Sequence, residues 1–343
     1  MNSIVAYTRF INSKRSLTFS GALILTLLSS ILLPLSLPNP VFAYGSPFIG
    51  IIALIPLYFA IYSQDSIKKI SLMGLVFGAV STALGNFWLA FFQDFSVWTL
   101  GGAVLGYMAY NALLFPFLFA GKEKKYRPLW FAIVWTAYEL LKSIGFLGYP
   151  WGLSAYSVTE IMPLIQIADM FGVYAISFII VLANSVIAEW LNGIGSNTLR
   201  TLPFKQGITA FTAVIICLTW IYGLVSLQRD IPVVATIDVV LVQNDGDGWA
   251  PGKFWNQLEN TQNLTWQAVK DRPAPDLIVW SETILRYPLP DYSIYYQRNP
   301  ENWPFTNFLQ SLPAPLLSGG AYMIDRDNFD MINAALLFNN NAR

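Results

Sequence analysis

The chain has 343 residues, of which 55% are hydrophobic and only 12% are charged, and this composition excludes a pair of ordinary soluble domains. It contains no histidine and a single cysteine, so Ser-His-Asp, Cys-His and zinc-protease chemistry and an intramolecular disulfide are excluded for these residues. Its balanced charge provides no basic surface of the kind that nucleic acid requires, and we expect no nucleic-acid partner.

Charge divides the chain into two parts. Residues 1–228 carry a net charge of +5 and residues 229–343 carry −5. The charged fraction rises from 19 of 228 residues in the first part to 21 of 115 in the second. We therefore predict a polytopic α-helical membrane bundle over residues 1–228 and a water-soluble, extracytoplasmic α/β domain over residues 229–343.

Uncharged runs in the first part predict seven membrane spans. A spanning helix needs about 20 mostly apolar residues, because every backbone amide in hydrocarbon must be paired within the segment. The uncharged run between Arg15 and Asp65 is interrupted near residues 38–45 and predicts two spans. Five further spans are predicted, at residues 70–93, 95–121, 128–147, 164–190 and 206–228.

Lysine and arginine alternate between successive loops. They occur before residue 16 and within residues 68–69, 122–127 and 200–205, but not within residues 38–47, 93–97 or 148–163. Because short cytoplasmic loops retain positive residues, we predict a cytoplasmic N-terminus and place residues 229–343 outside. The alternative is a cleaved signal peptide ending near Ala43, but its apolar run would be long for such a peptide.

Four charged residues fall inside the predicted spans. Because ionisable groups are costly in lipid, Glu139, Lys142, Asp169 and Glu189 are functional candidates by default. We favour a structural interpretation. Glu139 and Lys142 have the spacing of an ion pair on one helix, and the other two residues are expected near helix ends.

Strand and helix patterns alternate in the second part. Residues 237–242 and 276–280 predict two buried strands, and residues 254–270 between them predict a helix. Residues 316–320 and 332–338 have the pattern of two more strands. This order favours an α/β layer with partly parallel pairing.

Glu282 is the candidate catalytic residue because it directly follows the second predicted strand. The carboxyl ends of strands line the ligand crevice in α/β sheets, so an acid at this place is a candidate general base. The alternative is an ordinary solvated loop glutamate. The Asp/Gly run at residues 245–248 departs from an EF-hand loop at its sixth and twelfth places, and we predict no metal site.

Short motifs in both parts, taken in order, resemble the apolipoprotein N-acyltransferases. These are bacterial inner-membrane enzymes whose helical bundle carries a nitrilase-like extracytoplasmic domain. The first part contributes GYPWG at residues 148–152, QIAD at 166–169 and GVY at 172–174. The second contributes VLVQN at residues 240–244, Trp249, LIVWSET at 277–283, LSGG at 317–320 and NAA at 333–335.

The resemblance implies a Glu-Lys-Cys triad that moves an acyl chain from a phospholipid to the N-terminal amine of a diacylglyceryl-modified apolipoprotein, through a thioester on the cysteine. It makes Glu282 the general base. It places Trp249 near the substrate and Trp151 where a lipid chain could enter. We expect no cofactor and no metal, and a monomer in contact with membrane lipid in a bacterial inner membrane.

The chain departs from the family pattern in its triad. The family's lysine lies in a Y-x-K-x-H-L-V-P-F-G-E segment that would follow residue 338, and its cysteine lies further on; neither is present. Cys217 falls on a predicted membrane helix, where burial would leave a thiol unreactive. We therefore expect a C-terminally truncated acyltransferase, inactive as written. The alternatives are a membrane-anchored nitrilase-type amidohydrolase and a non-catalytic polytopic transporter.

Overall fold

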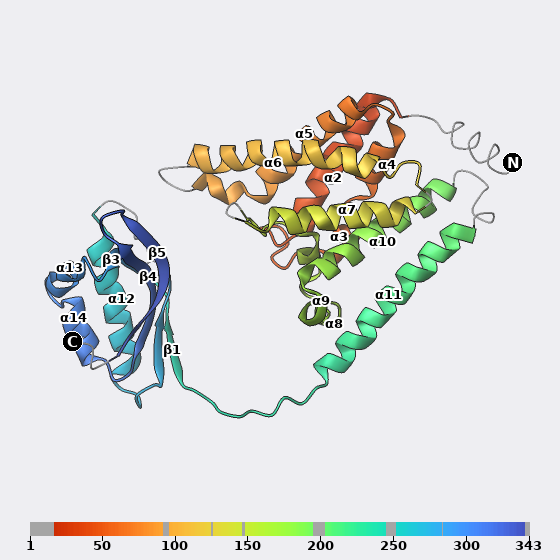
Figure 1. Cartoon of the computed structure of the whole chain (residues 1–343). Helices are drawn as coiled ribbons and strands as arrows, with labels where there is room; N and C mark the ends of the chain where they lie inside the picture. Colours follow the sequence, from red (N-terminus) through yellow and green to blue (C-terminus); the bar gives the residue numbers. More distant parts are fainter. Residues whose placement is uncertain are drawn as a thin grey trace, which may run out of the picture. The chain divides into compact units, whose positions relative to one another are not determined.

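The computed structural model describes residues 17–91, 96–124, 126–145, 148–194, 203–244, 252–282 and 284–339. Its chain divides into two compact units, with the boundary between Asp230 and Ile231 (Figure 1). We describe each unit by itself.

The regular secondary structure in the described residues of the first unit is all helical. Its long helices are α2 (Phe19–Ser36), α5 (Ile67–Gly85), α6 (Ser96–Phe119), α7 (Arg127–Lys142), α10 (Val173–Ile194) and α11 (Pro203–Leu227). Its short helices are α3 (Pro47–Gly50), α4 (Ile55–Ser63), η1 (Phe87–Phe91), η2 (Ser154–Val158), α8 (Met162–Ile165) and α9 (Ala168–Phe171).

Five helices of the described residues, namely α2, α5, α6, α10 and α11, are long and apolar enough to cross a membrane. The predicted membrane bundle is therefore confirmed, whereas the predicted count of seven spans is not. One predicted span, over residues 128–147, corresponds to α7. This helix has only 16 residues, fewer than the roughly 20 that a spanning helix needs. The second predicted span divides into α3 and α4, because turns occupy residues 51–54 and Pro56 stands at the start of α4.

The span predicted over residues 164–190 begins later than expected. Gly172 ends α9 with a φ of +71°, a left-handed conformation that glycine adopts readily, and the long helix α10 starts at the next residue. Residues 162–171 form the short helices α8 and α9. The apolar run that predicted one span therefore contains a glycine break as well as a helix.

Helices α5 and α6 pack backbone against backbone. A Cβ atom on Gly74 would lie 2.3 Å from the Asn111 carbonyl oxygen, and one on Gly78 would lie 2.4 Å from that of Tyr107. Small residues four apart allow this close approach between membrane helices. The contact fixes Tyr107 and Asn111 of α6 beside α5.

We expect Gly78→Ala to destabilise the membrane unit by about 1–3 kcal/mol, because the added methyl group forces two helix backbones apart. The measurement is thermal unfolding of the purified protein in detergent. Gly106→Ala on α6 is the matched control, since its Cβ would meet no atom within 4 Å. Equal melting temperatures for the two variants would contradict the backbone contact.

A buried charged cluster joins α4, α7 and α10. The Arg127 guanidinium forms an ion pair with Glu189, and the Tyr58 hydroxyl donates a hydrogen bond of 2.6 Å to the same carboxylate oxygen. The guanidinium carbon also lies 5.6 Å from the centre of the Tyr62 ring. Glu189 lies five residues from the end of α10, as expected, and it is buried, so its carboxylate connects three helices.

Helix α11 contacts the rest of its unit through a few specific residues. A Cβ on Gly223 would lie 1.7 Å from the Pro163 carbonyl oxygen, and the Tyr222 hydroxyl donates a hydrogen bond of 2.6 Å to Asp169. Cys217 on this helix is exposed on the protein surface, so burial of its thiol would have to come from lipid and not from protein packing. Its neighbours Leu218 and Ile221 are exposed too, as suits a surface facing lipid.

The second unit contains a mixed five-stranded sheet. Its strands are β1 (Val239–Val242), β2 (Leu277–Trp280), β3 (Leu285–Leu289), β4 (Leu316–Asp325) and β5 (Asp330–Phe338). Strands β1, β2 and β4 pair in parallel in that order, β3 pairs in parallel with β4, and β5 is antiparallel to β4. The sheet is completed by α12 (Phe254–Val269), α13 (Ser293–Arg298) and α14 (Phe305–Ser311).

The predicted strands at residues 237–242, 276–280, 316–320 and 332–338 correspond to β1, β2, β4 and β5, and the predicted helix is α12. Sequence reasoning missed β3, α13 and α14. The prolines at positions 288, 290, 300 and 304 hid them, because proline inside a short segment is typical of a turn or an edge.

The three helices cover one face of the sheet (Figure 1). The core between them includes Ile278, Phe308 and Leu316, and the Trp280 indole donates a hydrogen bond of 2.8 Å to Thr265 on α12. The prediction of buried strands is correct for this face only. Side chains on the opposite face of the sheet are exposed: Leu241 of β1 is 76% exposed and Leu337 of β5 is 60% exposed.

Candidate functional site

Glu282 lies in the turn that follows β2, and three strands define its position. Its carboxylate accepts a hydrogen bond from the Asn333 side-chain amide on β5. A Cβ on Gly319 of β4 would lie 3.0 Å from the Glu282 Cα and 3.3 Å from its Cγ. The glutamate therefore sits directly on a glycine of the neighbouring strand, and almost any larger residue there would push it away.

This geometry leaves the Glu282 carboxylate oriented and accessible. The side chain is exposed, and none of the ion pairs formed by the described residues involves it. The neutral side-chain amide of Asn333 donates a hydrogen bond to Glu282 Oε1, so the carboxylate is oriented without a cation beside it among the described residues. An oriented carboxylate whose second oxygen accepts no hydrogen bond from the described residues is suited to general-base chemistry.

Asn333 was not predicted as a site residue. In the sequence it stood in a strand pattern at residues 332–338 and in the NAA motif at residues 333–335, but neither gave it a role beside Glu282. Its role depends on the register of β5, which places Asn333 opposite Ala321 and Ala335 opposite Gly319. The signals in the sequence were the NAA motif and a polar side chain in an otherwise apolar strand pattern.

Trp249, the second candidate of this unit, lies outside the described residues. The loop that leads to it is anchored at its start. The Asn244 amide donates hydrogen bonds of 3.1 Å to the Gln257 carbonyl and to the Thr261 hydroxyl, both on α12. The placement of Trp249 near a substrate stays a prediction.

Trp151, the candidate of the membrane unit, is 53% exposed on the loop between α7 and η2. It stacks on Tyr149 with ring centres 5.9 Å apart and contacts Trp88 at 5.5 Å. Gly152 follows with a φ of +68°, so the backbone turns sharply at this point. The three aromatic rings form one cluster, in which Trp151 is exposed and Tyr149 and Trp88 are half-buried.

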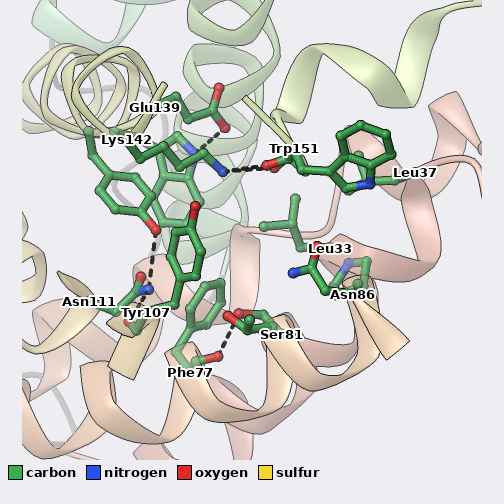
Figure 2. A pocket seen from close by; sticks show the side chains of 16 residues that line it. Leu33, Leu37, Phe77, Ser81, Asn86, Tyr107, Asn111, Glu139, Lys142 and Trp151 are labelled. Atoms are coloured by element: carbon green, nitrogen blue, oxygen red, sulfur yellow. Dashed lines mark hydrogen bonds between the residues drawn. The ribbon is translucent and has the colours of Figure 1, made fainter. Parts of the chain in front are cut away.

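A cavity of about 60 Å³ lies beside Trp151, inside the membrane unit (Figure 2). Helices α2, α5, α6 and α7 and the Trp151 loop supply its walls. The lining residues are Leu33, Pro34, Leu37, Phe77, Ser81, Thr82, Gly85, Asn86, Tyr107, Asn111, Trp135, Tyr138, Glu139, Lys142, Trp151 and Gly152. Sequence reasoning did not find this cavity, although it named three of the residues that line it.

Glu139 and Lys142 do not pair with each other as predicted. Glu139 Oε1 accepts hydrogen bonds from the Trp135 indole (2.9 Å) and from the Ser154 amide (2.8 Å) and hydroxyl (2.7 Å). Lys142 Nζ donates to the carbonyls of Trp151 (2.9 Å) and Gly152 (3.3 Å). Both residues instead fasten the loop that carries Trp151, because its backbone offers better placed partners.

Comparison with known proteins bears directly on this unit. Residues 29–186 match the family model described as the apolipoprotein N-acyltransferase N-terminal domain. The chain is 32% identical to apolipoprotein N-acyltransferase 2 of Treponema denticola over 90% of its length, and 34% identical to apolipoprotein N-acyltransferase 2 of Treponema pallidum over 85%. It is 30% identical to the apolipoprotein N-acyltransferase of Borreliella burgdorferi over 87%.

The chain belongs to the apolipoprotein N-acyltransferase family. It covers 60%, 56% and 57% of the lengths of these three relatives, respectively. The segment that matches the family model contains the cavity, Trp151 and both of the charged residues that hold the Trp151 loop. Glu282 lies beyond that segment. The match to the family model therefore concerns the membrane unit, and the role of Glu282 is argued from its own surroundings.

Proposed function

We propose that this protein acts in the transfer of a fatty acyl chain from a phospholipid to the N-terminal amine of a diacylglyceryl-modified lipoprotein, with Glu282 as the general base. The observation that carries the proposal is the position of Glu282 after β2, where Asn333 orients its carboxylate. The names of the relatives support the acyl-transfer reaction. The aromatic cluster around the exposed Trp151 supports entry of a lipid chain in the membrane unit.

The reaction has two steps. In the first step the base takes the proton of a thiol, and the thiolate attacks the phospholipid ester. The lysophospholipid leaves with that proton, and the acyl chain remains on the enzyme as a thioester. The lipoprotein amine then attacks the thioester, an amide forms and the thiol is restored. No residue among 1–343 matches the family's lysine segment or its nucleophile, since Cys217 lies on the apolar helix α11.

Acyl transfer should be measured on the protein expressed from its own gene, with labelled phospholipid and a diacylglyceryl-modified lipoprotein. We expect the label to reach the lipoprotein's N-terminal amine, with no added metal or cofactor. Hydrolysis of amides in the absence of phospholipid, without transfer to lipoprotein, would instead support a membrane-anchored amidohydrolase of the nitrilase type.

We further propose that the second unit is a nitrilase-like domain outside the cytoplasm of a bacterial inner-membrane protein, which acts as a monomer. This topology requires an odd number of membrane crossings before residue 229. Both counts are odd, the five long apolar helices of the described residues and the seven spans predicted from the sequence. The alternation of basic loops supports a cytoplasmic N-terminus.

A reporter enzyme that is active only outside the cytoplasm, fused after Arg229, should be active. The same reporter fused after Lys124, in the basic loop between α6 and α7, should be inactive. The measurement is reporter activity normalised to the amount of fusion protein. The opposite pattern would show that the orientation is reversed.

A further inference from the structure

The cavity beside Trp151 has one wall that is not helical. Residues 148–152, here called the strap, supply the lining residues Trp151 and Gly152. The other lining residues lie on α2, α5, α6 and α7 or directly after α2 and α5. Trp151 is 53% exposed and Pro150 is exposed as well, so polar contacts carry much of the attachment of the strap. Segments with few buried apolar contacts are those that open most easily.

Lys142 of α7 joins the strap to two helices. Its ammonium donates hydrogen bonds to the carbonyls of Trp151 (2.9 Å) and Gly152 (3.3 Å), as Figure 2 shows for Trp151. The same ammonium lies 5.8 Å from the ring centre of Tyr107 on α6 and 5.6 Å from that of Tyr138 on α7. Aromatic faces attract cations, so the two rings hold the ammonium in place while it holds the strap.

Two neutral hydrogen bonds also attach the strap. The Tyr149 hydroxyl donates to Asn86 Oδ1 (2.9 Å), directly after α5, and the Tyr156 hydroxyl donates to the Pro150 carbonyl (3.1 Å). Hydrogen bonds from a charged donor are roughly twice as strong as neutral ones. Lys142 therefore contributes more to holding the strap than either tyrosine does.

Behind the strap, two buried acceptor atoms have no hydrogen-bond partner in the described residues. They are Glu139 Oε2 and Asn111 Oδ1, on residues that line the cavity and are only 1% and 2% exposed. Buried polar atoms are almost always paired, and an unpaired one is costly. If the strap moves, water reaches the cavity and can donate to both atoms. This gain offsets part of the loss of the Lys142 hydrogen bonds, so the closed and open arrangements are close in free energy.

We propose that the strap is a gate on this cavity and that Lys142 holds the gate closed. The structure shows the closed arrangement. In the open one the hydrogen bonds from Lys142 to the carbonyls of Trp151 and Gly152 are broken, and the cavity can be reached from the surface at Trp151. The proposal does not rest on the proposed function, because it concerns access to the cavity and its test measures no acyl transfer.

The test is the reactivity of a thiol placed behind the strap. Thr82 on α5 lines the cavity and is only 5% exposed, and cysteine is close to threonine in size. Thr82→Cys is made in the full chain together with Cys217→Ser, which removes the native thiol. The measurement is the rate at which methyl methanethiosulfonate modifies the introduced thiol in detergent, followed by mass spectrometry. We expect slow modification, and a rate about tenfold higher when Lys142→Met is added, the effect of losing a hydrogen bond to a charged group.

Tyr149→Phe provides a milder second variant, which removes only the hydrogen bond to Asn86. We expect it to raise the rate about threefold, the smaller effect of losing a neutral hydrogen bond. Lys68→Met is the matched control for the loss of a lysine, since Lys68 is exposed and does not line the cavity. It should leave the rate unchanged.

The native Cys217 thiol, exposed on α11, reports on the rest of the membrane unit. In the chain that keeps this cysteine and Thr82, Lys142→Met should not alter its rate of modification. An introduced thiol at position 82 that reacts as fast as Cys217 while the strap is unaltered would overturn the closed gate. Rates unchanged by both Lys142→Met and Tyr149→Phe would overturn the role of these ties. An equal acceleration at Cys217 would show general loosening of the unit in place of a gate.

Discussion

Glu282→Gln is expected to lower acyl transfer by about a hundredfold to ten-thousandfold, the usual contribution of a general base. Glutamine keeps the oxygen that accepts from Asn333, so the turn after β2 should stay in place while the proton acceptor is lost. The measurement is the rate of label transfer from phospholipid to lipoprotein by the protein expressed from its own gene.

Glu259→Gln provides the matched control for that experiment. Glu259 is a glutamate on α12 of the same unit, and it also accepts a hydrogen bond from an asparagine, Asn302, at 3.2 Å. The control should keep its activity within a factor of about two, because an exposed substitution away from the site changes little. If Glu282→Gln were as active as this control, Glu282 would have no part in the proton transfer.

Arg127→Met is expected to destabilise the membrane unit by about 3–5 kcal/mol, the usual cost of removing one member of a buried ion pair. The guanidinium neutralises Glu189, which is buried where α4, α7 and α10 meet. Without it, Tyr58 remains as a neutral donor to the carboxylate. Thermal unfolding in detergent gives the measurement.

Two further variants separate the ion pair from other effects of substitution. Lys68→Met removes an exposed positive charge and should change stability by less than about 0.5 kcal/mol. The double variant Arg127→Met, Glu189→Leu should recover much of the loss, since it removes the buried negative charge together with its partner. A double variant less stable than Arg127→Met alone would argue against unpaired charge as the cause.

Apolar runs predicted the membrane unit well where one helix fills one run, as in α2, α5, α6 and α11. They failed where proline or glycine divides a run, because hydropathy does not register a break at Pro56 or Gly172. In the second unit the β-branched and aromatic runs predicted four strands and one helix, and the proline-rich stretch hid β3. Apolar runs thus predict which segments form the membrane unit, whereas proline and glycine decide where individual helices begin and end.

The sites were less predictable than the fold. The position of Glu282 after a strand could be read from the chain, but its contact with Asn333 depends on the pairing of β4 with β5. The spacing of Glu139 and Lys142 permits an ion pair on one helix. The fold instead offers them the backbone of residues 151–154, and such long-range partners leave no local pattern in the sequence.

The close contact of Gly74 and Gly78 with α6 has a consequence for which part of the cavity wall can move. The α5–α6 part consists of two helices in direct backbone contact, and separating them would require breaking that contact. The Trp151 part is a loop held by hydrogen bonds to the side chains of Glu139 and Lys142. Fluctuations in the size of the cavity should therefore arise mainly from the loop, with the helix pair as its rigid frame.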